Sequence, residues 1–254
     1  LPILNEKPTN QNCYYCNEIL DETKVIDHNH YNGKIRGYSC SKCNSKEGQI
    51  TKFVPIYFHN LSGYDAHLFI KQLSKKQDQY SKLKILAKTG EDYISFQFGC
   101  LRFLDSYRFF LSSLEKVSKS LSKDQMEITS KYYKNEDEFN LLKQKGFYPY
   151  EWMDNIDKLN NTKLPNKEDF YSRLTDENIS DENYQHALNV WNIFNCKTFK
   201  DYHELYLKTD VLLLADCFEN FRKFFMKNHE IDPCHCYSTP GLTGQCGLKY
   251  TKCQ

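Results

Sequence analysis

Two Cys-x2-Cys pairs near the start of the chain constrain its fold more than any other feature. The pairs are Cys13-Cys16 and Cys40-Cys43. Each pair supplies two thiolates from one tight turn, and four thiolates complete a tetrahedral zinc site. A segment as short as residues 1–52 buries little apolar surface, so we expect a structural zinc to hold it together. Disulfides are disfavoured, because no segment has the pattern of a secretion signal.

The run between the two pairs, residues 24–37 (KVIDHNHYNGKIRG), predicts a β-hairpin. Residues 25–26 are β-branched and favour a strand. Asn32-Gly33 is a strong signal for a two-residue turn, and residues 34–36 supply the return strand. The second cysteine pair then opens a helix that continues through residue 47.

Asp27, His28 and Asn44 carry the chemistry that this segment predicts. The carboxylate of Asp27 and the amide oxygen of Asn44 suit a hard divalent cation such as Mg²⁺ or Mn²⁺. Imidazoles exchange protons near neutral pH, so His28 is the candidate base for an attacking water. The cation would stabilise the negative charge that builds up on a phosphate during cleavage.

The whole segment resembles the recombination endonuclease VII branch of the HNH, or ββα-metal, nucleases. The matching residues are Cys13, Cys16, Asp27-His28-Asn29-His30, Gly33-Lys34, Arg36-Gly37, Cys40, Cys43-Asn44 and Glu47-Gly48. The resemblance implies that His28 is the general base, that Asp27 and Asn44 hold the catalytic metal, and that Glu47 assists. It also implies a branched DNA substrate and a homodimer, although the family's C-terminal dimerisation helices are not recognisable.

A zinc module that only folds and docks is the competing interpretation. A bare zinc knuckle, however, needs neither Asp27-His28 before the hairpin nor Asn44 directly after the last cysteine. Lys34 and Arg36 either contact DNA phosphates or are simply solvated on a short hairpin. His30 either faces the phosphate or bonds within the hairpin, and we favour the second.

From residue 53 onward the pattern predicts strands first and helices later. The expected strands are residues 53–60, 84–87, 93–98 and 101–109. The expected helices are residues 66–73, 112–121, 168–174, 183–194 and 203–225, with a loop at 160–166. This order predicts an α+β or α/β layer arrangement after the zinc module.

Two further motifs lie in this part of the chain. Asn60-x3-Tyr64-Asp65 follows the first predicted strand, and Tyr206-x3-Asp210 places two side chains one turn apart on the longest predicted helix. They resemble the second and third exonuclease motifs of family B DNA polymerases of the protein-primed type, found in linear plasmids, viruses and Maverick-like mobile elements. Ser113-Leu114-x-x-Val117 resembles the short motif that lines the single-strand path in that family. The resemblance covers most of residues 53–251.

This second resemblance implies that residues 53–254 form a ribonuclease H-like, DEDD exonuclease-like α/β domain with additional helices. Such exonucleases hold two metals with four carboxylates. Asp65 and Asp210 supply two, but no apolar-flanked Asp-x-Glu precedes Phe58, and the polymerase palm motifs are absent. The missing pair would then lie upstream of Leu1, and we expect an inactive exonuclease fold that still grips single-stranded or branched DNA.

Three functions follow from these motifs. The first is a metal-dependent HNH endonuclease, positioned on DNA by the exonuclease-like domain. The second is a non-catalytic DNA-binding remnant of a mobile-element polymerase. The third is a fragment of a 3′–5′ proofreading exonuclease. All three imply an intracellular site of action, in the nucleus or where viral or mobile-element DNA replicates, and no segment reaches transmembrane length.

The overall charge leaves DNA contacts to local patches. Lys and Arg number 34 against 33 Asp and Glu, for a net charge of +1. The lysine-rich run Lys71–Lys88 is one such patch, although a solvated helix face is the simpler interpretation. Of the remaining cysteines, Cys234, Cys236, Cys246 and Cys253 form either a second metal site or free thiols, and we favour thiols. We expect Cys100, Cys196 and Cys217 in the core.

Overall fold

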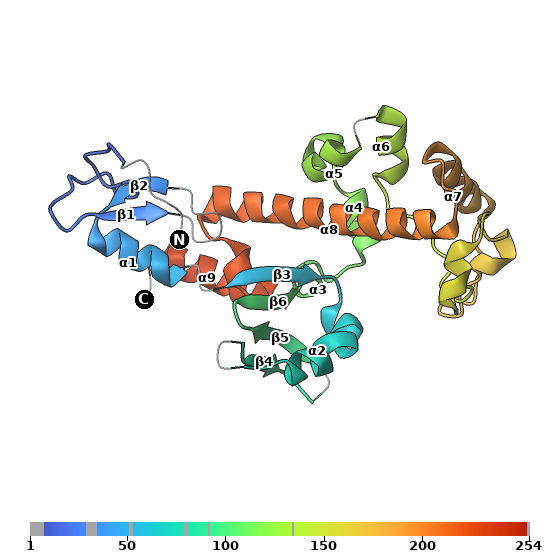
Figure 1. The fold of residues 1–254 in the computed structure, drawn as a ribbon, viewed down its shortest axis with the longest axis horizontal. Helices are drawn as coiled ribbons and strands as arrows, with labels where there is room; N and C mark the ends of the chain where they lie inside the picture. Colours follow the sequence, from blue (N-terminus) through green and yellow to red (C-terminus); the bar gives the residue numbers. More distant parts are fainter. Residues whose placement is uncertain are drawn as a thin grey trace. The chain divides into compact units, whose positions relative to one another are not determined.

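The computed structural model describes residues 8–28, 35–50, 53–78, 81–90, 92–133 and 135–252, with the backbone alone for residues 46–50. The strands are β1 Val25–His28, β2 Ile35–Ser39, β3 Val54–Phe58, β4 Leu83–Ala87, β5 Tyr93–Phe98 and β6 Leu101–Asp105. The helices are α1 Ser41–Ile50, α2 Asp65–Lys75, α3 Tyr107–Phe110, α4 Leu114–Lys119, α5 Glu127–Tyr132, α6 Glu136–Leu142, α7 Asp181–Ile193, α8 Phe199–His229 and α9 Thr239–Thr251 (Figure 1). The protein is therefore a mixed α+β structure, as predicted.

The chain forms two compact units, which we describe separately. The first comprises Leu1–Ile56, Leu73–Lys84 and Gln97–Arg102. The second comprises Tyr57–Gln72, Ile85–Phe96 and Phe103–Gln254.

The first unit contains the predicted strand, strand and helix. Strands β1 and β2 pair antiparallel, with Asp27 opposite Gly37, and a bulge follows Asp27. Asn10 extends the hairpin, since its side chain accepts the N–H of Tyr38 and donates to the Tyr38 carbonyl. Gly37 has φ +151°, and a Cβ there would lie 3.0 Å from Asn10 Oδ1. Glycine is therefore required at this position. The Asn32-Gly33 turn lies outside the described residues.

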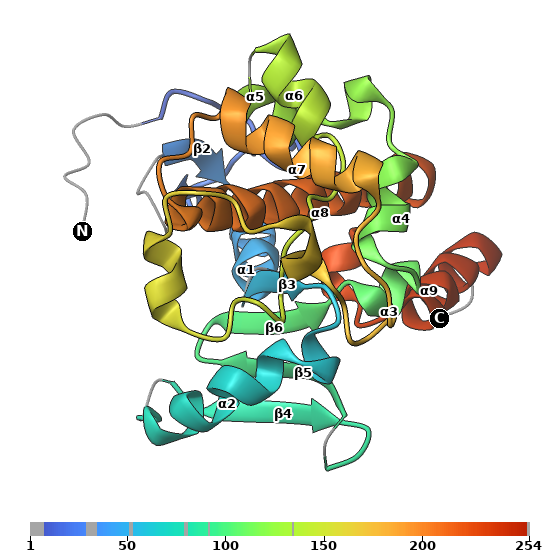
Figure 2. The same ribbon diagram turned by 90° about the vertical axis from the view of Figure 1, so that its right-hand side faces the viewer.

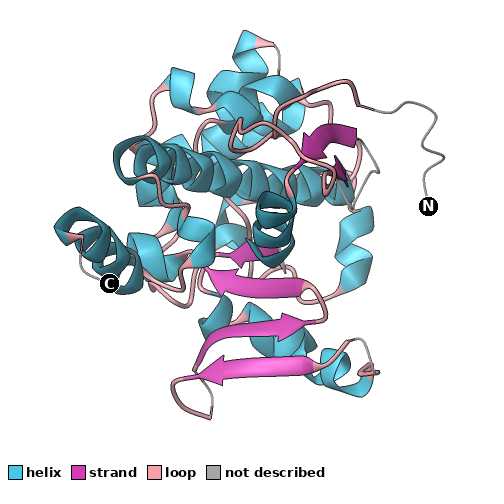
Figure 3. Cartoon of the chain, turned by 90° about the vertical axis from the view of Figure 1, so that its left-hand side faces the viewer, coloured by secondary structure: helices cyan, strands magenta, loops and turns pink. Residues whose placement is uncertain are grey.

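Strands β3 to β6 form one sheet in the order β3-β6-β5-β4, drawn in magenta in Figure 3. The N–H of Val54 bonds to the Cys100 carbonyl and that of Ser106 to the Phe58 carbonyl, so β3 and β6 run in parallel. Helix α2 covers one face of the sheet, as Figure 2 shows. Its Phe69 packs against Phe58, Phe96 and Phe103.

The predicted strand 101–109 is too long. Strand β6 ends at Asp105, whose carboxylate accepts the N–H of Tyr107 two residues later, and the chain turns there into α3. Cys100 lies on the exposed turn between β5 and β6, so its predicted burial is wrong. Cys196 and Cys217 are buried as predicted.

The second unit is built around α8, the 31-residue helix along which α4 and α5 lie. Its main apolar core includes Phe139, Phe170, Phe199 and Leu213. A second cluster joins Phe109 and Phe218 to α9. Within the described residues, no helix is both long enough and apolar enough to cross a membrane.

The predicted helix 168–174 is wrong beyond its first turn. A short 3-10 helix, Lys167–Phe170, is followed by a turn that a bridge between Ser172 and Glu177 closes. The N–H of Arg173 bonds to the Glu151 carboxylate, and Ser172 pairs with Glu177. The backbone of Ser172 and the N–H of Arg173 therefore bond to partners that they could not reach from within a helix.

Candidate functional site

The four predicted cysteines meet at one point in the first unit. The Sγ atoms of Cys13, Cys16, Cys40 and Cys43 all lie within 4.8 Å of one another. The Sγ atoms of Cys16 and Cys40 are 4.0 Å apart. A tetrahedral Zn–S distance of about 2.3 Å implies S–S separations of roughly 3.8 Å. The four cysteines are thus clustered suitably for a structural zinc.

Backbone N–H groups donate hydrogen bonds to two of these sulfurs, those of Cys13 and Cys40. The N–H of Cys40 lies 3.4 Å from Cys13 Sγ, and that of Cys43 lies 3.4 Å from Cys40 Sγ. Burial raises the pKa of Cys13, but backbone N–H donors outweigh it and lower the value to about 6. The hydrogen bond with Cys40 raises the pKa of Cys43 to about 12. The four thiols lose their protons together only when a bound cation balances the negative charge of the thiolates.

Asp27 lies on β1, in the same unit as this cluster, and is only 5% exposed. Arg36 Nη1 lies 2.9 Å from Asp27 Oδ2, and the Tyr15 hydroxyl donates to the same oxygen at 2.8 Å. Arg36 also donates to the Tyr15 hydroxyl at 2.8 Å. Burial, and then the hydrogen bond to Asp27, raise the pKa of Tyr15 to about 12. The hydrogen bond to Asp27 raises the pKa of Arg36.

We call Tyr15, Asp27 and Arg36 the carboxylate clamp. Its geometry holds one oxygen of Asp27, Oδ2, with two donors, and Oδ1 receives neither of them. Sequence reasoning missed Tyr15. Its only signal was its place inside the first cysteine pair, where zinc binding fixes the backbone.

The other predicted residues of the first site lie on the elements expected for them. His28 ends β1, opposite Ile35. Asn44 lies in the first turn of α1, where its N–H bonds to the Cys40 carbonyl. Glu47 lies on α1, but its side chain, like His30 and Lys34, falls outside what the structure describes. Zinc at the second cysteine pair would set the register of Asn44, because Asn44 follows Cys43 directly.

The second predicted site lies in the second unit, around the end of β6. Asn60 takes up a left-handed backbone conformation, with φ 66°, and its N–H bonds to Asp105 Oδ1 at 2.8 Å. Asp65 begins α2. Its pKa is raised by burial and then by the charge of Asp105. Sequence reasoning missed Asp105, which is 3% exposed, because an acid at the end of a strand has no motif of its own.

On α8, Tyr206 and Asp210 lie one turn apart as predicted. The Tyr206 hydroxyl lies 2.7 Å from that of Tyr150. Burial raises the pKa of Asp210, while the charge of Lys145 and a hydrogen bond from Tyr206 lower it. Its Oδ1 is buried without a hydrogen-bond partner in the described part of the chain. Asp210 is therefore no ordinary surface acid.

The remaining predicted positions have structural roles. The Ser113 hydroxyl caps α4 by accepting the N–H of Lys116, and Leu114 is buried. Cys234 and Cys236 are buried and Cys246 is half-buried, while Cys253 lies outside the described residues. Among the residues described, the cluster at Cys13 is the only group of His, Cys, Asp or Glu arranged to hold a metal.

Comparison with known proteins identifies two families in this chain. Residues 4–82 match the family described as recombination endonuclease VII. Residues 50–246, well over half of the chain, match the family described as DNA polymerase type B, organellar and viral. No curated protein and no solved structure matches the chain. The chain therefore belongs to the organellar and viral type B DNA polymerases and carries a recombination endonuclease VII domain at its N-terminal end.

Proposed function

We propose that the protein is a metal-dependent DNA endonuclease of the HNH type, with branched DNA as a substrate. The observation that carries this proposal is the buried Asp27, held by Tyr15 and Arg36 and followed by His28. It lies within the residues that match recombination endonuclease VII, which also contain the four clustered cysteines. A module that only docks has no need to bury a carboxylate in this way. We assign residues 1–52 to this ββα-metal module and residues 53–254 to a second domain.

The proposed chemistry is hydrolysis of one phosphodiester bond. His28 takes a proton from an attacking water, whose oxygen bonds to phosphorus as the P–O ester bond breaks. Tyr15 and Arg36 hold the Asp27 carboxylate in one orientation. Asp27 and Asn44 offer the oxygen ligands that Mg²⁺ or Mn²⁺ prefers. Such a cation, when bound there, would stabilise the charge on the scissile phosphate. The leaving oxygen takes its proton from solvent.

We further propose that the second domain is ribonuclease H-like and positions DNA without cutting it. Asp65 and Asp210 support descent from an exonuclease site. Asp105 does not complete that site, since its oxygens already accept the N–H groups of Asn60, Ser62 and Tyr107.

The test compares a labelled four-way junction with a plain duplex of equal length, in Mg²⁺ and in Mn²⁺. We expect internal cuts from the wild type and from Asp210→Ala, and none from His28→Ala with its zinc content unchanged. A higher rate on the junction supports the branched substrate. Cuts that survive His28→Ala contradict the assignment.

Two other outcomes support the competing functions. DNA binding without cuts under either metal supports a non-catalytic remnant. Mononucleotide release from a 3′ end that stops in Asp210→Ala supports an exonuclease, for which the buried Oδ1 of Asp210 is the favourable observation.

A further inference from the structure

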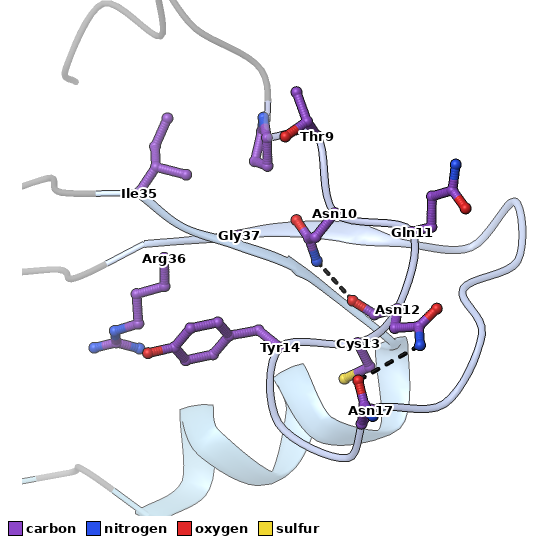
Figure 4. Close-up of a pocket in the computed structure, with 11 residues that line it drawn as sticks. Thr9, Asn10, Gln11, Asn12, Cys13, Tyr14, Asn17, Ile35, Arg36 and Gly37 are labelled. Carbon is purple, nitrogen blue, oxygen red and sulfur yellow. Dashed lines mark hydrogen bonds between the residues drawn. The ribbon is translucent and has the colours of Figure 1, made fainter.

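A pocket of about 760 Å³ opens beside the carboxylate clamp, and its size lies within the roughly 300–1,000 Å³ typical of ligand sites. Figure 4 shows the residues that line it. They come from the first cysteine pair, from the segments directly before and after it, and from β2. Arg36, a member of the clamp, forms part of the wall. The pocket therefore touches the proposed cleavage centre.

One wall of the pocket is rigid. Asn10 makes three hydrogen bonds to the backbone, two with Tyr38 and one with the carbonyl of Asn12. Asn12 pairs with Ile19 in a β-bridge. A wall built this way is in place before any ligand arrives, so binding costs little ordering.

The two tyrosines of the first cysteine pair have different surroundings. Tyr15 is committed to the clamp. Tyr14 lines the pocket, is 57% exposed, and meets the Tyr15 ring edge-on at 5.2 Å. An exposed aromatic ring held by a rigid neighbour is a platform on which a nucleobase can stack.

The polar groups of the pocket suit a base attached to a phosphate. Gln11, Asn12 and Asn17 line it with side-chain amides, each of which offers both donors and an acceptor, as base edges require. The Nδ2 of Asn12 lies 3.5 Å from the Oδ1 of Asn17. A hydrogen bond of this length is weak, so a ligand can replace it. Arg36 adds a cationic side chain to the wall, and its ion pair with Asp27 balances part of that charge. Among the described residues that line the pocket, none is acidic.

We propose that this pocket binds one unstacked nucleobase of the DNA strand to be cut, with its ring on Tyr14 and its edge on the amides. The proposal rests on the proposed endonuclease function and names its substrate feature, namely a base free of its stack, as found at branches and in single strands. Duplex DNA with every base stacked does not fill the pocket.

The test uses the full-length, zinc-loaded protein without added Mg²⁺ or Mn²⁺. The probe is a single-stranded oligonucleotide that carries 2-aminopurine, whose fluorescence falls on stacking against an aromatic ring. We expect quenching with the wild type and with Tyr14→Phe, which keeps the ring. Tyr14→Leu should weaken apparent binding by about 5- to 150-fold, the range expected from losing one base–aromatic stack. Tyr250→Leu is the matched control, since Tyr250 is 90% exposed on α9.

Equal quenching by Tyr14→Leu and the wild type would overturn the pocket, whether or not the protein cuts DNA. Quenching that depends on Tyr14 in a protein that fails to cut would support the pocket and refute the endonuclease. Cleavage with His28 dependence separates these results, because His28 does not line the pocket.

Discussion

At the scale of single residues, the clamp orients the buried Asp27 carboxylate, which we propose as a metal ligand. Two donors on Oδ2 neutralise and orient Asp27 in the folded protein. Groups that orient a metal ligand in this way typically affect metal affinity or activity by about 10- to 100-fold. With Asp27 as the proposed metal ligand, the clamp therefore predicts that loss of the Tyr15 donor weakens metal binding.

Tyr15→Phe removes the donor and keeps the ring. We expect the Mg²⁺ concentration for half-maximal cleavage to rise by about 10- to 100-fold with zinc content unchanged. A titration of cleavage rate against Mg²⁺ measures this, with Tyr14→Phe as the control from the same turn. An unchanged Mg²⁺ requirement would show that Arg36 alone orients Asp27.

The raised pKa of Asp210 predicts that the stability of the folded protein depends on pH. Its pKa is raised in the folded protein, chiefly by burial, so the folded state binds the proton more tightly than the unfolded state does. Its contribution is favourable at low pH and is lost as pH rises from about 3.9 through the raised value. Relative to the wild type, Asp210→Asn should therefore gain free energy of unfolding as the pH rises above about 4 through the raised pKa of Asp210. Urea titrations at several pH values measure this.

At the scale of elements, a carboxylate on α8 caps the N-terminal end of α5. Asp216 is 1% exposed and accepts the N–H groups of Ile128 and Thr129 at 2.7 and 2.9 Å. Two of the unpaired donors at the start of α5 thus find their acceptor on another helix. This contact ties α5 to α8 across a long sequence separation.

Asp216→Ala should lower the free energy of unfolding by about 2–4 kcal/mol, because it leaves one buried and one half-buried N–H group without an acceptor. Urea denaturation measures the loss. Asp201→Ala is the matched control, since Asp201 caps the start of α8 at an exposed position and its loss should cost less. A larger loss for Asp201→Ala would contradict this account.

At the scale of the whole molecule, the two compact units are stabilised in different ways. The second unit has an extended apolar core. Within the described part of residues 8–50, the only buried hydrophobic residue is Cys13. We therefore expect the module that carries the four cysteines to depend on a bound zinc, and the helices around α8 not to.

Zinc chelation should abolish amide-exchange protection in β1 and β2 and leave that of α8 unchanged. Cys16→Ser should act like the chelator, whereas Cys100→Ser, at an exposed turn, should have no effect. Protection of β1 that survives zinc removal would mean that the hairpin is stable by itself. Hydrogen exchange followed by mass spectrometry measures all three cases.

Local patterns in the sequence were enough to predict the cysteine cluster, the hairpin and α1, most strands of the sheet, and α7 and α8. The reason is that turn residues, alternation and helical periodicity act over a few positions. The two wrong predictions have different causes. A distant partner, Glu151, accepts the N–H of Arg173 and prevents a helix there. Strand β6 ends early for a local reason, because the Asp105 carboxylate accepts the N–H of Tyr107 two residues later.

The sequence by itself determined which residues can carry the chemistry, namely the four cysteines, Asp27-His28 and the two exonuclease-like motifs. Only the tertiary structure decided what surrounds them. Tyr15 and Arg36 close on Asp27, Asp105 meets Asn60, and Tyr14 faces a pocket. Each of these arrangements depends on how separate strands and turns pack together, and no pattern of neighbouring residues encodes such packing.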